Sequence, residues 1–129
     1  MVEIAEWHAT LAFDQLSEGW VEGVTVVTPA GAAKLILLRN GDAVCAYRDA
    51  CPHEGFPLSE TGIIEDGVLI CGKHLWEFDV ATGKHISRLE RPECNLKRYP
   101  VRVADGVVEV DVRGYEAPRP RADDDVIDG

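Results

Sequence analysis

The chain has 129 residues, of which 46% are hydrophobic, and this length and composition suit one compact domain with a modest core. Its formal net charge of -10 argues against nucleic-acid binding, because phosphates call for a surface rich in Lys and Arg. No apolar run approaches the ~20 residues of a membrane span, and no secretion signal is recognisable. We therefore expect a cytoplasmic protein with a basic protein partner and no membrane partner.

Short runs rich in Val, Ile and Leu, separated by turn dipeptides, predict an all-β domain. Near the N-terminus, HATLAF and GVTVVT are expected to form two strands, and the Phe13–Gly19 segment at most a short turn of helix. Asn40-Gly41 lies between two apolar runs and predicts a hairpin over Lys34–Arg48. Asp66-Gly67 and Asp105-Gly106 predict two further tight turns.

The C-terminal segment YEAPRPRADDDVIDG differs from the rest in being rich in Pro and Asp and lacking apolar periodicity. We therefore divide the chain into a folded domain over residues 1–113 and an acidic, flexible tail over residues 114–129.

Cysteine and histidine occur as two matched pairs in the middle of the chain, Cys51-x-His53 and Cys71-x-x-His74, with seventeen residues between the pairs. Two cysteines on one iron and two histidines on the other is the mixed ligation of a Rieske [2Fe–2S] centre. The same four side chains could hold a structural zinc ion, but zinc fingers usually pair Cys with Cys and His with His. The spacing therefore favours one [2Fe–2S] cluster, held by loops at about 49–58 and 71–78.

These loops resemble those of the Rieske ferredoxins: CPHEGFPLSETG is similar to the first cluster loop of that family and CGKHLWEFDVATG to the second. The stretch PECNLKRYPVRVADGVVEV is similar to its closing strands. The resemblance covers about Gly19 to Val112. It implies three stacked antiparallel sheets, with the cluster loops forming a small subdomain at one tip and the histidines reaching solvent.

Respiratory members of the family brace these loops with a disulfide, whereas the matching positions here are Phe56 and Lys73. They also place a Ser and a Tyr hydroxyl near the cluster, where this chain has Trp76 and Phe78. Fewer donors to the cluster sulfurs lower the reduction potential, so the resemblance implies a low-potential ferredoxin of a bacterial oxygenase.

Within that group, the HLWEFD and PECNLKRYPV runs most resemble the ferredoxin component of toluene-type diiron monooxygenases, although KHISRLERPEC is longer and more basic than expected. The ferredoxins of Rieske ring-hydroxylating dioxygenases are the near alternative. The small subunit of an assimilatory nitrite reductase is a more distant one. The implied role is not enzymatic. It is the transfer of single electrons from an NADH-dependent flavin/iron–sulfur reductase to an oxygenase hydroxylase, by a carrier that is monomeric when free.

The remaining conspicuous side chains are interpreted structurally. Cys45 and Cys94 are expected to be small buried residues without a metal. His8 and His85 are expected at the surface. Trp7 and Trp20 are expected to pack on the sheets, and Trp76 and Phe78 to shield the cluster from water.

Overall fold

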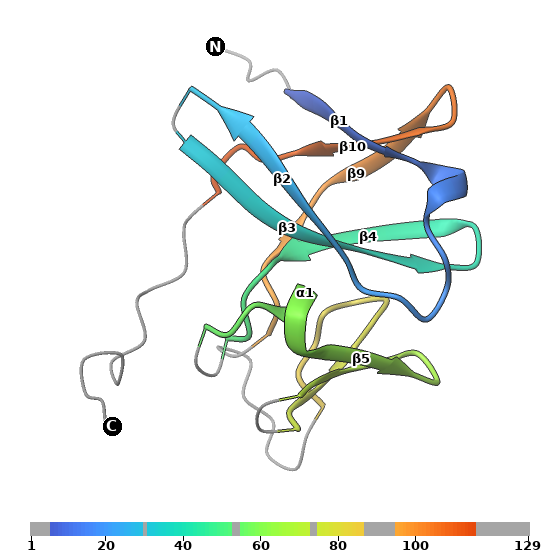
Figure 1. Ribbon diagram of the computed structural model, residues 1–129, viewed down its shortest axis with the longest axis vertical. Helices are drawn as coiled ribbons and strands as arrows, with labels where there is room; N and C mark the ends of the chain where they lie inside the picture. Colours follow the sequence, from blue (N-terminus) through green and yellow to red (C-terminus); the bar gives the residue numbers. More distant parts are fainter. Residues whose placement is uncertain (1–5, 30, 53–54, 73–74, 87–94, 116–129) are drawn as a thin grey trace.

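The computed structural model describes residues 6–29, 31–52, 55–72, 75–86 and 95–115. Three antiparallel sheets make up most of it (Figure 1), which confirms the all-β prediction. Sheet A consists, in spatial order, of β1 (Trp7–Ala12), β10 (Val107–Asp111) and β9 (Val101–Ala104). Sheet B consists of β2 (Glu22–Thr28), β3 (Gly31–Asn40), β4 (Ala43–Arg48) and β8 (Arg98–Tyr99). Sheet C consists of β5 (Gly62–Glu65), β6 (Val68–Cys71) and β7 (Glu77–Asp79).

Sheet B is the middle layer. Alternate residues of β3 point to opposite faces, so that Leu35 and Leu37 enter one core while Ile36 and Leu38 enter the other. The first core also takes side chains from sheet A, and the second takes side chains from sheet C. All four residues are fully buried, which is why this strand is a continuous apolar run rather than an alternating one.

The tight turns largely follow the predictions. Asp66-Gly67 and Asp105-Gly106 both have positive φ at each residue, the conformation that closes a two-residue hairpin. The Lys34–Arg48 hairpin is also confirmed, but its turn lies one residue later than predicted, because Asn40 pairs with Ala43. The turn is therefore Gly41-Asp42, with the positive φ of 66° on the glycine at its first position.

Two short helices complete the described fold. The 3-10 helix η1 (Phe13–Gln15) lies inside the segment predicted as a turn of helix. The α-helix α1 (Leu58–Thr61) was not predicted, since four residues are too few to show helical periodicity. No helix among the described residues is long and apolar enough to cross a membrane.

The chain passes from sheet B to sheet A at Pro100, between β8 and β9. Proline has no amide hydrogen to give to a strand ladder, which suits a position where one ladder ends and another begins. Its carbonyl still accepts the Asp111 N–H at 3.0 Å. The tail prediction concerns residues 114–129, of which 116–129 lie outside the described residues, so it stays a prediction.

Two expectations about packing are wrong. Trp20 is 68% exposed in the loop before β2, whereas Trp7 is half-buried on sheet A beneath the Arg102 guanidinium, 4.5 Å from the ring centre. His85 is only 3% exposed, because it pairs with Phe78 across an antiparallel bridge and so points into the core. His8 is half-buried on β1.

Candidate metal centre

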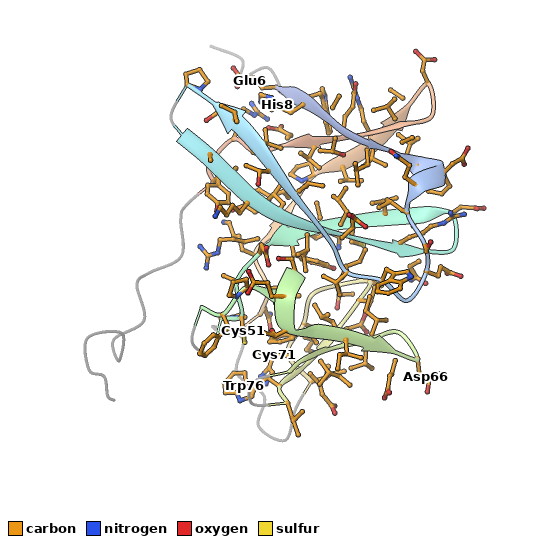
Figure 2. The ribbon with its side chains drawn as sticks, viewed as in Figure 1. Glu6, His8, Cys51, Asp66, Cys71 and Trp76 are labelled. Carbon is orange, nitrogen blue, oxygen red and sulfur yellow. The ribbon has the colours of Figure 1, made fainter. Side chains whose placement is uncertain are left out.

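Two of the four predicted ligands, Cys51 and Cys71, lie at the same end of the molecule (Figure 2) and belong to one buried cluster between sheets B and C. Cys51 comes three residues after the end of β4, and Cys71 is the last residue of β6. Both thiols are buried and neither forms a disulfide. The structure therefore brings together two thiols that are separated by twenty positions in the sequence.

The first loop is closed at its base by main-chain hydrogen bonds. The Cys51 N–H donates to the Phe56 carbonyl at 2.9 Å, and the Gly55 N–H donates to the Cys51 carbonyl at 2.6 Å. Gly55 has a φ of 80°, a left-handed conformation that glycine adopts without steric cost.

The second loop repeats the same pattern. The Cys71 N–H donates to the Trp76 carbonyl and the Leu75 N–H donates to the Cys71 carbonyl, both at 2.8 Å. Leu75 occupies the position of the glycine in the first loop and also has a positive φ, 62°, which costs a leucine about 1–2 kcal/mol. A backbone held in an unfavourable conformation by the hydrogen bonds of its loop is typical of a functional site.

The predicted histidine ligands, His53 and His74, lie outside the described residues. In the sequence, His53 lies between Cys51 and Gly55, and His74 lies between Cys71 and Leu75. Gly55 and Leu75 are the residues that close the two loops. The described residues hold no group of three or more potential metal ligands, and only two of the four predicted ligands are among them.

A carboxylate fixes the first loop to α1. Asp49 accepts the Ser59 N–H at 2.8 Å with one oxygen and the Ser59 hydroxyl at 2.6 Å with the other. The N–H belongs to the first turn of the helix and has no partner within it, so Asp49 acts as a cap supplied from the loop. The sequence pattern gave no indication of this contact.

A close main-chain contact fixes the second loop to the end of the same helix. The Gly72 N–H donates to the Thr61 carbonyl at 2.9 Å, and a Cβ at residue 72 would lie only 2.4 Å from that oxygen. Glycine is thus required at position 72, because the main chain there lies too close to the Thr61 carbonyl to leave room for a side chain. Together, Asp49 and Gly72 hold both loops against one short helix.

The inner face of sheet C covers the thiols. Phe78 is fully buried and Trp76 is half-buried, and both pack in the core that holds Cys51 and Cys71, while their shielding of the cluster stays a prediction. The His85 ring stacks on Trp76 with centroids 4.4 Å apart and lies tilted against Phe78 at 5.5 Å. His85 therefore belongs to the cover of the site. No signal in the sequence indicated this, because Lys84 and Ile86 share the outward face and do not form a polar/apolar alternation with it.

A buried hydroxyl, that of Tyr47, lies in the same core. The Tyr47 O–H donates to the Val80 carbonyl at 2.7 Å. Burial and the neighbouring Cys45 thiol raise the pKa of Tyr47, so the phenol stays protonated. Cys45 itself is buried on β4, as predicted, whereas Cys94 lies outside the described residues.

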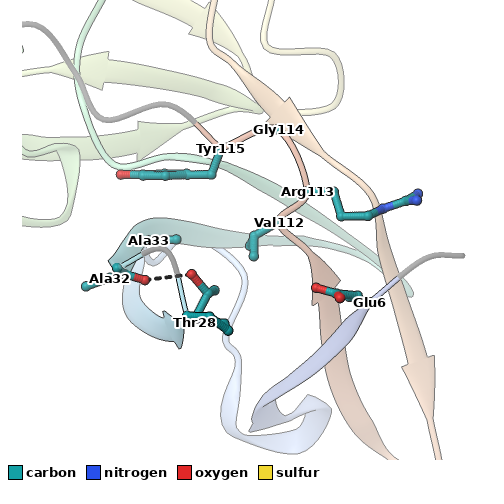
Figure 3. Close-up of a pocket in the computed structure, with 10 residues that line it drawn as sticks. Glu6, Thr28, Ala32, Ala33, Val112, Arg113, Gly114 and Tyr115 are labelled. Carbon is teal, nitrogen blue, oxygen red and sulfur yellow. Dashed lines mark hydrogen bonds between the residues drawn. The ribbon is translucent and has the colours of Figure 1, made fainter. Parts of the chain in front are cut away.

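A hollow of about 450 Å³ lies at the opposite end of the molecule from the cysteines (Figure 3). The Thr28 hydroxyl donates to the Gly31 carbonyl at its edge, at 2.8 Å. Its lining includes Glu6, Ala33, Val112, Arg113 and Tyr115. Because no cysteine or histidine lines it, this hollow supplies no ligand to the metal site.

The residues present suit an iron–sulfur cluster. Thiolates are soft ligands that favour such clusters, and here two of them are shielded from water in matched loops. The model for the Rieske [2Fe-2S] domain matches residues 6–100. The chain belongs to the Rieske [2Fe–2S] domain family. Its cofactor is accordingly one [2Fe–2S] cluster of the Rieske type.

Curated relatives of this Rieske protein include ferredoxins of dioxygenases and of monooxygenases. The anthranilate 1,2-dioxygenase ferredoxin subunit of Burkholderia cepacia is 34% identical over 84% of this chain and 94% of its own length. The ferredoxin component of the alkene monooxygenase system of Xanthobacter autotrophicus is 33% identical over 80% of this chain and 79% of its own.

Solved structures give the same fold. The carbazole 1,9a-dioxygenase ferredoxin, described in complex with its oxygenase, matches with a TM-score of 0.67 and 32% identity, over 81% of this chain and 92% of that one. A nitrite reductase small subunit from Mycobacterium tuberculosis matches with a TM-score of 0.66 and 26% identity, over 84% of this chain and 96% of that one. The predicted three-sheet Rieske fold is confirmed.

Proposed function

We propose that this Rieske protein is the ferredoxin of a bacterial multicomponent oxygenase, and that Cys51, His53, Cys71 and His74 hold its cluster. It carries single electrons from an NADH-dependent flavin/iron–sulfur reductase to the hydroxylase of an aromatic or alkene monooxygenase. The observation that carries the proposal is the pair of matched loops, each with a buried cysteine at its base.

When bound, the cluster supplies reversible one-electron storage. The chain itself provides the ligands, shields the cysteine side from water through Trp76 and Phe78, and offers a docking surface. Because both thiols are buried, we expect the histidine side of the site to face outward. This chain binds no organic substrate, and the choice of substrate belongs to the hydroxylase.

The monooxygenase assignment rests on the HLWEFD and PECNLKRYPV runs and is consistent with the alkene monooxygenase relative. A dioxygenase ferredoxin is the second candidate, and it is favoured by the anthranilate dioxygenase relative at 34% identity. We further propose a cytoplasmic protein that is monomeric when free, since a carrier must dissociate from each partner in turn.

Both partners should approach the end of the molecule that holds the cysteines, because electron transfer weakens steeply with distance. The proposed docking residues are Pro52, Glu54, Phe56, Lys73 and Leu75, of which Glu54 and Lys73 lie outside the described residues. Leu75 is 69% exposed, and Pro52 and Phe56 are half-buried. The net charge of -10 should steer the encounter toward basic partner surfaces and make its rate fall with salt.

Stopped-flow reduction of the hydroxylase at several salt concentrations tests this function. Glu54→Lys should slow association while leaving the spectrum and the midpoint potential unchanged. Deletion of the tail after Tyr115 should have a much smaller effect. Rates that do not depend on salt, or a deletion more harmful than Glu54→Lys, would contradict the proposal.

A further inference from the structure

The outer face of sheet C carries an aligned row that is apolar at three of its four positions. Ile63 of β5 pairs with Ile70 of β6, and Ile70 pairs with Glu77 of β7. The Ile86 N–H donates to the Glu77 carbonyl at 2.8 Å, which adds a fourth position to the row. Paired residues of antiparallel strands project from the same face, so Ile63 and Ile70 lie side by side, and Ile86 lies in the same row beyond Glu77.

This row faces away from the core. The neighbouring row on the opposite face consists of Ile64, Leu69, Phe78 and His85, which pack toward sheet B. In the outer row, Ile63 is 54% exposed and Ile86 is 41% exposed, and Ile70 between them is half-buried. Three isoleucines in one surface row of an acidic protein, interrupted by Glu77 alone, form a mainly apolar strip of the kind that marks a protein interface.

The border of the strip is mainly acidic. The next outward-facing row consists of Glu65, Val68, Asp79 and Lys84. With Glu77, the outer face therefore carries three acidic groups and one basic group. A second copy of this chain would bring these like charges together, on a molecule whose net charge is already -10. The strip instead fits a different protein, with an apolar centre bordered by Lys and Arg.

The strip also adjoins the proposed docking end. β7 begins two residues after Leu75, the exposed residue that closes the second cysteine loop. A partner that covers Leu75 can extend onto sheet C without leaving the site of electron transfer. We propose that the outer face of sheet C, centred on Ile63, Ile70 and Ile86, is an additional contact surface for the oxygenase component. This inference rests on the proposed function, and it names a surface outside the cysteine loops.

Ile63→Thr tests the surface, because threonine keeps the β-branched shape of a strand residue and removes the apolar contact. The probe is the purified oxygenase hydroxylase from the same organism as this chain, titrated calorimetrically with the cluster-loaded ferredoxin. We expect the Kd to rise about tenfold, which corresponds to about 1.4 kcal/mol. The absorption spectrum and the midpoint potential should not change. Ile86→Thr serves as the second variant and should weaken binding in the same direction.

Val103→Thr on β9 is the matched control, since Val103 is also an exposed β-branched strand residue, 45% exposed on sheet A. It should bind the hydroxylase as the wild type does. If both isoleucine variants bind as tightly as the wild type, or if the control loses as much affinity, the surface assignment is wrong. A loss confined to reduction by the reductase would also overturn it, as would a dimer of the free wild type that Ile63→Thr dissociates. Failure of the wild type to bind or reduce the hydroxylase would instead contradict the proposed function.

Discussion

Gly72→Ala should loosen the second cysteine loop without touching a ligand. The added methyl would lie 2.4 Å from the Thr61 carbonyl oxygen and 3.4 Å from the Thr61 carbonyl carbon. Both are backbone atoms at the end of α1, so neither can rotate away as a flexible side chain would. The methyl can be accommodated only if the loop and the helix move apart.

The cost of that movement can be estimated from its parts. Overpacking of a tight site costs ~1–3 kcal/mol. The hydrogen bond from the Gly72 N–H to the same oxygen, 2.9 Å long, must also lengthen, and a hydrogen bond contributes ~1 kcal/mol. We expect a total loss of about 2–4 kcal/mol, which for a domain of this size lowers the melting temperature by roughly 10–20 °C.

The assay is thermal unfolding followed by circular dichroism and, in parallel, by the loss of visible cluster absorbance. Gly67→Ala is the control. It lies in the β5–β6 turn of the same sheet, where a Cβ would meet nothing within 4 Å, and only the positive φ of 77° opposes the substitution. Its cost should be about 1 kcal/mol. The close-contact argument would be refuted if the melting temperature of Gly72→Ala equalled that of the wild type or exceeded that of the Gly67→Ala control.

Three further predictions concern the loop, the potential and acid stability. Asp49→Ala removes the cap on α1 and should lower the unfolding free energy by about 1–2 kcal/mol in chemical denaturation and accelerate cluster loss. Glu109→Ala, which breaks the surface pair with Arg102 but leaves Arg102 over Trp7, should do neither. The midpoint potential should lie toward the lower end of the roughly −150 to +300 mV range of Rieske centres, and voltammetry in the upper third would contradict the assignment. Burial opposes ionisation of Asp111, but the Arg113 N–H and its guanidinium, 3.0 Å away, outweigh it and hold the pKa of this carboxyl below its ordinary value. The resulting stability is present above pH ~4 and is lost as the pH falls through the lowered pKa, so the stability gap between wild type and Asp111→Asn should shrink in urea titrations below that pH.

The strands and turns were predictable because their signals are local. Asp66-Gly67 and Asp105-Gly106 specify positive φ at two successive positions, and the structure has both. Asn40-Gly41 specifies a hairpin but not its register, since the glycine alone can serve as the first turn residue. The cysteines were predictable as a pair, and the structure brings Cys51 and Cys71 into one buried cluster.

The supporting contacts were not predictable in the same way. The Asp49–Ser59 cap and the Gly72–Thr61 approach depend on where α1 sits, and a four-residue helix has no periodic pattern. Leucine disfavours a positive φ, so nothing local indicates the conformation of Leu75. Alignment of the two loops at their cysteines would have revealed it, because Leu75 then falls opposite Gly55.

The central claim is that Cys51, His53, Cys71 and His74 hold a Rieske cluster in this chain. The most direct measurement is pulsed electron–nuclear double resonance on the reduced protein labelled with ¹⁵N-histidine. We predict couplings from two histidine nitrogens in the wild type and in Cys45→Ser, and loss of the native signal in His53→Ala and in His74→Ala. A colourless zinc protein, or a His53→Ala or His74→Ala variant that keeps the wild-type spectrum with both couplings, would contradict the account.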